Sequence, residues 1–336
     1  MIIPFFIPHS GCPHQCVFCN QKNITGQTKP VAPLAIPQKI TEYLAVSSSD
    51  KPAHVAFYGG SFTALPFETQ EAYLTAVQPF IHTGQIAGIR LSTRPDCITN
   101  EIIAMLREYR VTTIELGVQS MDDVVLARSG RGHTATDTVN SVSLIRSTDF
   151  LIGLQLMPGL PGDSADSFMK TIDTVIALKP DFIRIYPALV IKDTPLEDLY
   201  ASARYVPLSL HDAVALCREA LERLELAGIE VIRIGLQPTG VLEKPGTIIT
   251  GPYHPAFRQL VESSILLDKM RCALRNCTGK TGRVTFQVNP KDLSAAIGQK
   301  RSNIKKLEKE FGFHKIQIVA GQNALRRREL TLISSG

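Results

Sequence analysis

Short β-rich runs alternate with amphipathic, helix-like segments along most of the chain. The runs expected to form strands cover residues 2–8, 54–60, 88–95, 112–120, 150–159, 182–190 and 230–238. Segments with helical periodicity lie between them, at 68–81, 99–109, 134–147, 164–178 and 209–227. Strands that alternate with helices at a spacing of ~30–40 residues predict βαβ units and a parallel sheet. The strand runs are nearly continuous in hydrophobicity, which predicts a sheet covered on both faces.

Most of these runs end in glycine, proline or polar residues. The endings read YGGSFT, STRPD, GVQS, MPGLPGD and YPALVIK. In β/α barrels the functional groups lie at the C-terminal ends of the strands, on the loops that enter the helices. The first run, at 2–8, leads into a loop with three cysteines. The pattern therefore predicts a barrel mouth built around that loop.

The periodicity changes near residue 280. A strand is expected at 284–288, a short helix at 292–298, a basic turn QKRS, a helix at 303–312 and a strand at 315–320. This β-α-turn-α-β order predicts a small, separate α+β domain. We therefore expect a barrel at 1–255, a linking helix at 256–278 and a basic domain at 279–336.

Composition excludes several classes of protein. Hydrophobic residues make up 44% of the 336 residues, enough for a sizeable core. No apolar stretch approaches the ~20 residues of a membrane span. The apolar start MIIPFFIP has no basic region before it and contains two prolines, so it predicts a buried strand rather than a signal peptide. We expect a cytoplasmic protein with no membrane partner.

The basic charge is concentrated at the end of the chain. Residues 279–336 carry 12 Lys and Arg against 4 Asp and Glu, whereas the remaining residues carry 24 against 27. A local balance of this kind favours a polyanionic partner.

Three cysteines lie close together in the segment HSGCPHQCVFCNQ. Cys12, Cys16 and Cys19 form a Cys-x3-Cys-x2-Cys pattern. Closely spaced thiolates are the usual ligands of iron–sulfur clusters. Three ligands for a 4Fe–4S cluster leave one iron open to the amino and carboxylate groups of S-adenosyl-L-methionine. A structural zinc site normally needs four ligands; His9 or His14 could complete one, but no second Cys or His pair follows at finger spacing.

The cysteine motif resembles that of the radical S-adenosylmethionine (radical SAM) superfamily. Residues 1–260 look like the radical domain of the catalytic subunit of elongator and its shorter bacterial relatives. The matching stretches are RPD (94–96), IELGVQS (114–120), RGHT (131–134), LMPGLPGD (156–163) and YPALVIKDTPLEDLYASARYVPLS (186–209). The resemblance implies a partial (β/α)6-type barrel and a 4Fe–4S cluster that cleaves S-adenosyl-L-methionine to a 5′-deoxyadenosyl radical. It also implies a reducing electron donor such as flavodoxin or ferredoxin. The family's best-known substrate is the wobble uridine of tRNA.

The resemblance further implies roles for individual residues. Cofactor contacts are expected at Phe18, Gly59, Gly60, Ser61, Arg94, Gln119, Ser120, Leu156 and Met157. Tyr186, Lys192 and Tyr205 are expected on the substrate side, as catalytic residues. Simpler interpretations stay open, because ordinary βα turns explain the glycines, a core position explains Tyr205 and a solvated surface explains Lys192.

The tail AAIGQKRSNIKKLEKEFG resembles a KH module, in which a Gly-x-x-Gly loop clamps a single-stranded nucleic-acid backbone. Arg301 stands where the second glycine would be. RNA contacts are expected at Gly298, Lys300, Arg301, Lys305, Lys306, Arg326, Arg327 and Arg328. The ~60 residues after 278 are too few for the acetyltransferase domain of the elongator enzyme, which puts transfer of an acetyl-derived group in doubt. The alternative is a stabilising domain with a solvated basic face.

Three alternative functions are consistent with the sequence. The favoured one is a radical enzyme that modifies tRNA or rRNA. The second is radical chemistry on a small molecule, as in oxygen-independent coproporphyrinogen oxidases; those typically carry a further cysteine where this chain has Gln21. The third is a non-catalytic RNA-binding protein. A second metal site at Cys272 and Cys277 is disfavoured because residues five apart on a helix do not face each other.

Overall fold

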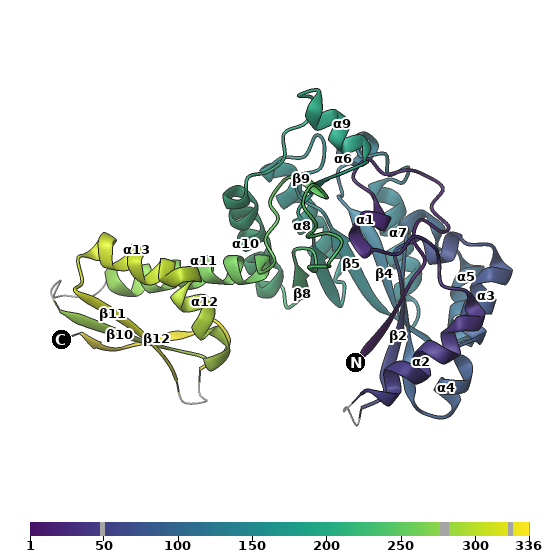
Figure 1. Ribbon diagram of the computed structural model, residues 1–336, viewed down its shortest axis with the longest axis horizontal. Helices are drawn as coiled ribbons and strands as arrows, with labels where there is room; N and C mark the ends of the chain where they lie inside the picture. Colours follow the sequence, from purple (N-terminus) through teal and green to yellow (C-terminus); the bar gives the residue numbers. More distant parts are fainter. Residues whose placement is uncertain (48–50, 276–281, 322–324, 336) are drawn as a thin grey trace. The chain divides into compact units, whose positions relative to one another are not determined.

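The computed structural model describes residues 1–47, 51–275, 282–321 and 325–335. The chain divides into two compact units (Figure 1). The first contains residues 1–209 and 223–253, and the second contains residues 210–222 and 254–336. Each unit is described by itself below. Cys277 lies outside the described residues.

A seven-stranded parallel sheet forms the first unit. Its strands are β1 (Ile2–Phe6), β2 (Ala53–Tyr58), β3 (Ile86–Thr93), β4 (Val111–Gln119), β5 (Leu151–Leu156), β6 (Phe182–Ile185) and β8 (Glu230–Ile234), in that spatial order. Every neighbouring pair is parallel. The expected α/β architecture, a curled open sheet with helices between its strands, is confirmed (Figure 1). A short antiparallel pair, β7 (Val190–Ile191) and β9 (Ile248–Thr250), lies apart from it.

Helices connect the strands. They are α1 (Gln21–Thr25), α2 (Ile36–Ala45), α3 (Phe67–Thr75), α4 (Gln78–His82), α5 (Asn100–Glu108), α6 (Asp123–Arg128), α7 (Ala135–Arg146), α8 (Ala165–Leu178), α9 (Pro195–Ala201) and α10 (Leu210–Leu226), with 3-10 turns at Pro33–Ala35, Phe62–Ala64 and Pro95–Cys97. The helix expected at 68–81 is two helices, because Pro79 fits only the first turn of a helix and begins a new one. Capping boxes at Thr134 and Ser164 begin α7 and α8.

The two faces of the large sheet differ in chemistry. Side chains such as Phe57, Leu91 and Ile114 point to the outer face and are fully buried. The alternate positions, among them Arg90 and Glu115, form an inner face of polar and charged residues. The nearly continuous hydrophobicity of the strand runs in the sequence gives no sign of this polar inner face. Because strand side chains alternate, this polar row lines the concave side of the sheet.

The second unit is built on a three-stranded sheet. Its elements are α11 (Phe257–Arg275), β10 (Arg283–Val288), a 3-10 turn (Pro290–Asp292), α12 (Leu293–Ile297), a second such turn (Gln299–Arg301), α13 (Ser302–Phe311), β11 (Lys315–Ala320) and β12 (Leu330–Ser335). The strand order is β11-β10-β12, with β10 parallel to β11 and antiparallel to β12. Leu266 and Met270 of α11 share one hydrophobic core with Phe286 and Leu307. Helix α11 therefore packs as part of this unit; the domain limits at 255 and 278 stay a prediction.

Among the described residues, none of the helices combines the length and the apolar character needed to cross a membrane.

Candidate functional site

The cysteine loop between β1 and α1 is held in place by three segments. The Ser61 N–H donates to the Ser10 carbonyl at 2.9 Å, and the His9 N–H donates to the Gly59 carbonyl at 3.2 Å. The Val17 N–H donates to the Ser129 carbonyl, and the Leu196 N–H donates to the Val17 carbonyl. The ends of β2 and α6 and the start of α9 thus fix a loop that has no regular structure of its own.

Gly60 lets two backbones approach each other. A Cβ at this position would lie 2.4 Å from the Ser10 carbonyl oxygen and 2.5 Å from the Ile7 carbonyl oxygen. The close approach shown here is thus between the turn after β2 and the cysteine loop. The expected contact of Gly59, Gly60 and the cofactor stays a prediction.

The three thiols lie on one loop but differ in burial. Cys16 is buried, Cys19 is half-buried and Cys12 is exposed. Burial, reinforced by the neighbouring thiols of Cys16 and Cys12, raises the pKa of Cys19 to about 12. Without a metal this thiol is protonated at neutral pH, so binding of a metal to it must release a proton.

Arg131 places a positive charge beside these thiols. Its Nη1 donates to Cys16 Sγ at 3.2 Å and its Nη2 donates to the Gly117 carbonyl at 2.5 Å, while the side chain is buried. A Cβ on Gly132 would lie 2.2 Å from the His14 ring, so this segment packs directly on the cysteine loop. Arg131 was not among the residues expected at the site; the signal in the sequence is an arginine between two glycines, Gly130 and Gly132.

The donor set fits an iron–sulfur cluster better than a single ion. In the described part of the chain, no three His, Cys, Asp or Glu side chains are arranged to hold one metal ion. A tetrahedral zinc site needs its ligands around a single centre. In a four-iron cluster each thiolate binds a different iron, so the thiols need not converge on one point. Three thiols on one fixed loop, with a buried guanidinium against one of them, therefore fit such a cluster.

A surface pocket of about 620 Å³ lies in the second unit, and a pocket of about 500 Å³ opens at the cysteine loop in the first. The latter is lined by Cys12 and Cys19 and by His9, His14 and Lys22. Solvent and small ligands can therefore reach two of the three thiols.

Gln119 is the expected cofactor residue with the most unusual geometry. It ends β4 with φ 68°, a conformation uncommon outside glycine. Its side-chain Oε1 accepts from Gln155 Nε2 at 3.1 Å, and its carbonyl accepts from the Met157 N–H at 2.9 Å. Local strain of this kind concentrates at functional sites, which supports the expected role of Gln119.

Other expected cofactor residues lie near the site but are occupied within the fold. Arg94 is buried, with Nε and Nη2 donating to the two oxygens of Asp96 at 2.9 and 2.8 Å. The Ser61 hydroxyl accepts from the Arg94 N–H and lies 3.2 Å from Thr93 Oγ1. Phe18 and Met157 pack in one small apolar cluster with Val125, Leu160 and Ala188.

Two expected cofactor residues point away from the inner face. The Ser120 hydroxyl lies 3.4 Å from Thr171 Oγ1 of α8 and accepts from the Asp122 N–H. Leu156 is fully buried and is the register partner of Ile185 on the outer, apolar face. Leu156 is also the register partner of Gln119 on β4, but the Gln119 side chain is bonded to Gln155.

The three residues expected on the substrate side occupy different environments. The Tyr186 hydroxyl accepts from Arg184 Nη1 at 3.3 Å on the inner face. Tyr205 is buried and its hydroxyl donates to the Gly159 carbonyl at 2.6 Å. The Lys192 side chain is exposed, and its carbonyl accepts from Asn20 Nδ2 at 3.0 Å. Tyr186 is therefore the one whose hydroxyl meets the polar inner face.

His133 is buried without a partner. It is 4% exposed, and neither ring nitrogen has a hydrogen-bond partner among the described residues. Burial, with the nearby Arg131 and Arg94, lowers the pKa of His133 to about 4, so the ring is neutral at pH 7.

The loop between α12 and α13 carries the basic residues expected to contact RNA. Gly298 has φ 74°, and Lys300 and Arg301 have φ 51° and 61°, in the left-handed region. Lys300, Arg301, Lys305 and Lys306 are all exposed. Buried Asn303 fixes the start of α13, because its Nδ2 donates to the carbonyls of α12 and to Ser263. The turn thus presents Lys300 and Arg301 to solvent, and the first part of α13 presents Lys305 and Lys306.

The arginine run before β12 has a different role in the structure. Asp292 is fully buried, and Arg327 Nε donates to it at 2.5 Å. Arg327 Nη2 lies 3.3 Å from Glu262, and the Arg328 N–H also donates to Asp292. The Arg327 guanidinium, although 45% exposed, therefore links Asp292 to Glu262 within this unit. The Arg326 side chain is exposed, and its backbone N–H donates to Glu329 at 2.8 Å.

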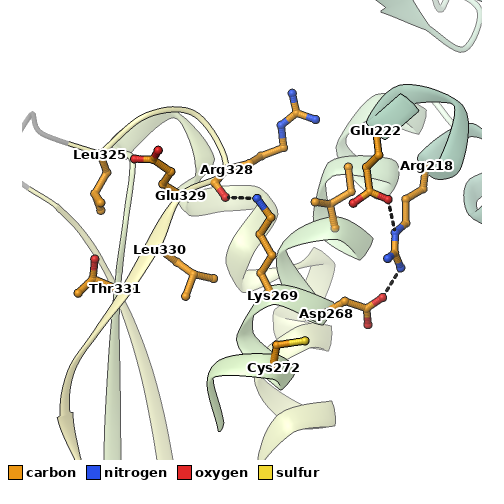
Figure 2. Close-up of a pocket in the computed structure, with 11 residues that line it drawn as sticks. Arg218, Glu222, Asp268, Lys269, Cys272, Leu325, Arg328, Glu329, Leu330 and Thr331 are labelled. Atoms are coloured by element: carbon orange, nitrogen blue, oxygen red, sulfur yellow. Dashed lines mark hydrogen bonds and ion pairs between the residues drawn. The ribbon is translucent and has the colours of Figure 1, made fainter. Parts of the chain in front are cut away.

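The larger pocket contains charges that are already paired (Figure 2). Arg218 donates to Glu222 at 3.2 Å and to Asp268, and Lys269 Nζ donates to the Arg328 carbonyl at 2.9 Å. The charges of Arg218, Glu222 and Asp268 are thus paired with one another, and Lys269 is bonded to the backbone.

Comparison with known proteins identifies the class to which this chain belongs. Residues 6–175 match the model of the radical SAM superfamily, and residues 180–266 match that of a radical SAM C-terminal domain. Because the first match alone covers half of the chain, the protein belongs to the radical SAM superfamily of enzymes.

Several relatives indicate which members of the superfamily this chain resembles. The chain is 27% identical over 245 residues to a tRNA uridine(34) acetyltransferase of Methanocaldococcus jannaschii, covering 60% of this chain and 45% of that protein. It is 29% identical over 183 residues to elongator complex protein 3 of Homo sapiens, covering 48% and 34%. The archaeal Elp3 of Methanocaldococcus infernus shares the fold, with a TM-score of 0.64 at 22% identity over 80% of this chain and 63% of that one. The chain thus spans half or less of the length of the named curated relatives. The expected elongator-like resemblance is confirmed.

Proposed function

We propose that this protein is a radical SAM enzyme that modifies tRNA. The observation that carries the proposal is the rigid loop that presents Cys12, Cys16 and Cys19 beside Arg131. A 4Fe–4S cluster on these thiols would supply reductive cleavage of S-adenosyl-L-methionine. The three cysteines would bind the cluster, and Arg131 would offset the negative charge of the Cys16 thiolate.

The inner end of β4 is where we place the S-adenosyl-L-methionine. Gln119 is held in a strained conformation with its side chain bonded to Gln155, so its amide is fixed before any ligand binds. The turn at Gly59 and Gly60 lies against the cysteine loop. A preorganised amide and a half-buried turn next to three thiols support a small-molecule site at this position.

The proposal that the substrate is tRNA rests on the second unit and on the relatives. Lys300, Arg301, Lys305 and Lys306 form an exposed group around one turn, which suits contacts to phosphates. Similarity to tRNA uridine(34) acetyltransferases favours tRNA over rRNA. Arg327 is left out of the proposed RNA contacts, since its guanidinium is bonded to Asp292 and lies against Glu262.

Two measurements test the proposal. Mass spectrometry of tRNA nucleosides from cells with and without the protein should show one modified nucleoside that disappears. An unchanged profile, together with retained S-adenosyl-L-methionine cleavage by the purified protein, would contradict the choice of tRNA and favour a small-molecule substrate.

The second measurement is the salt dependence of tRNA binding. Substituting Lys300→Gln and Arg301→Gln together should lower the slope of log K against log salt by about 1.4, because each phosphate contact contributes about 0.7 on single strands. Lys170→Gln, an exposed lysine on α8, serves as the matched control and should leave the slope unchanged. Equal slopes for all three proteins would remove the loop from the interface.

A further inference from the structure

A buried carboxylate on the inner face is surrounded by arginines. Glu115 of β4 is 6% exposed. Arg90 Nη2 donates to its Oε1 at 2.7 Å, and Arg184 Nη2 donates to the same oxygen at 3.3 Å. The Tyr58 hydroxyl also donates to Oε1, at 3.1 Å. Oε1 of Glu115 therefore accepts from groups on three other strands.

The arginines outnumber the acids on this face. The seven strands contain three arginines, Arg90, Arg184 and Arg233, and two acids, Glu115 and Glu230. Glu230 is exposed at the start of β8, so Glu115 is the one buried acid among these strand positions. Glu115 is ion-paired with Arg90 and Arg184, and Arg233 is a third arginine on the neighbouring strand, so three arginines stand against one buried acid at these strand positions.

Two of these guanidinium groups keep unused donors. Arg184 Nε lies 2.9 Å from Glu115 Oε2, but its N–H is not directed at that oxygen and has no hydrogen-bond partner among the described residues. Arg233 is the register partner of Arg184 on β8 and is half-buried. No hydrogen bond or ion pair of Arg233 is found in the described part of the chain. A buried N–H without an acceptor is costly, and the half-buried Arg233 has no counter-ion among the described residues, so this arrangement favours an added acceptor.

This position is connected to the cysteine loop. Arg131 joins Cys16 to the Gly117 carbonyl of β4, and Gln119, two residues further along, is bonded to Gln155. Gln155 is in turn the register partner of Arg184. The arginines therefore lie on the same inner face as the end of β4. Arg184 is 17% exposed, so solvent reaches it.

We propose that Arg184 and Arg233 form a binding site for an oxyanion, a phosphate or carboxylate group of the molecule on which the radical chemistry acts. The inference rests on the proposed function and names a chemical group of its substrate. A planar guanidinium binds such groups through two parallel hydrogen bonds. The ion pair with Glu115 fixes the Arg184 side chain, and Arg233 on the neighbouring strand β8 supplies the second guanidinium of the site.

Inorganic phosphate is the probe for this site. Its binding to the full-length protein is measured by calorimetry at constant ionic strength, with chloride as the balancing anion. Arg233→Gln should weaken phosphate binding about tenfold or more, the loss of hydrogen bonds to one charged group. Arg233→Lys, which keeps the charge without the fork, should fall between the wild type and Arg233→Gln. Arg107→Gln, an exposed arginine on α5, is the control and should bind like the wild type.

The source of the oxyanion follows from competition. If tRNA supplies the phosphate, then tRNA displaces inorganic phosphate from the wild-type protein and Arg233→Gln weakens tRNA binding. If a small co-substrate supplies it, tRNA and inorganic phosphate bind together and Arg233→Gln leaves tRNA affinity unchanged. Both results support the site.

Two results would overturn the inference: no saturable phosphate binding by the wild type, or equal binding by the wild type and Arg233→Gln. Circular dichroism of Arg233→Gln checks that the variant is folded, as expected for a side chain without a partner. Cleavage of S-adenosyl-L-methionine and tRNA modification by the wild-type protein are measured separately. If both persist without phosphate binding, this inference fails while the proposed function stands; if both are absent, the proposed function fails whatever the phosphate result.

Discussion

Replacing Gly60 by alanine should displace the cysteine loop. The new Cβ would lie 2.4 Å from the Ser10 carbonyl oxygen and 2.5 Å from the Ile7 carbonyl oxygen, whereas real Cβ contacts stay above 3.0 Å. Both atoms belong to the backbone, so the loop or the turn after β2 must move by at least about half an ångström.

Two contributions determine how far Gly60→Ala lowers the free energy of unfolding. Forcing extra volume between packed segments costs about 1–3 kcal/mol. The hydrogen bond from the Ser61 N–H to the Ser10 carbonyl, 2.9 Å long, is weakened in addition, which costs about 1 kcal/mol. The free energy of unfolding should therefore fall by about 2–4 kcal/mol. Because the cysteines lie on the displaced loop, iron bound per chain should fall as well.

The assay uses one matched control. Gly240→Ala adds the same methyl group where no atom lies within 4 Å and φ is not positive, so it should change the free energy of unfolding by less than about 0.5 kcal/mol. Urea unfolding of the metal-free proteins gives the first readout, and iron content after anaerobic reconstitution gives the second. If Gly60→Ala matched the wild type in both, the reasoning about the contact between this turn and the cysteine loop would be wrong.

Three further predictions concern buried polar groups. The pKa of His133 is about 4 in the folded protein and 6.5 in the unfolded chain, so the unfolded chain binds a proton at a higher pH. The free energy of unfolding is therefore highest above pH 6.5 and falls as the pH drops toward 4, by about 2–3 kcal/mol at pH 4.5. Urea unfolding at pH 7 and 4.5 should show this loss in the wild type and a smaller one in His133→Asn; equal losses would contradict it. Arg327→Ala should lower the free energy of unfolding by about 3 kcal/mol, because it removes the guanidinium that pairs with buried Asp292. The control Arg326→Ala should change it by less than about 0.5 kcal/mol. Equal unfolding midpoints for the two variants would refute the structural role of Arg327. Tyr205→Phe should lower the free energy of unfolding by about 1 kcal/mol through one lost hydrogen bond, and an unchanged value would show that the bond contributes nothing.

The sequence was sufficient to predict the parallel sheet and the cysteine loop. Both depend on local signals: the alternation of strand and helix patterns, and the spacing of Cys12, Cys16 and Cys19. The endings of the strands also placed Gln119 at the correct edge. The order β10-α12-α13-β11 was likewise readable from residues 284–320, because each element is short and closed by glycine or basic residues.

The polar inner face could not be predicted, because it depends on strand register. Arg90, Glu115 and Arg184 lie on three strands separated by whole helices, and one shift of register would send each side chain to the opposite face. The position of Arg131 against Cys16 is similarly non-local, since 115 residues separate them. Nothing in the run of three arginines at 326–328 distinguishes Arg327, which is ion-paired with Asp292 and Glu262, from its neighbours.

The central claim is that Cys12, Cys16 and Cys19 together hold a cluster that cleaves S-adenosyl-L-methionine. The most direct measurement compares three single variants, each with one of these residues changed to alanine, with Cys97→Ala as control. Iron content and the formation of 5′-deoxyadenosine are measured on anaerobically reconstituted, reduced protein. The account predicts that each of the three variants loses both, while Cys97→Ala keeps both. Full iron content and 5′-deoxyadenosine formation in any of the three variants would contradict it.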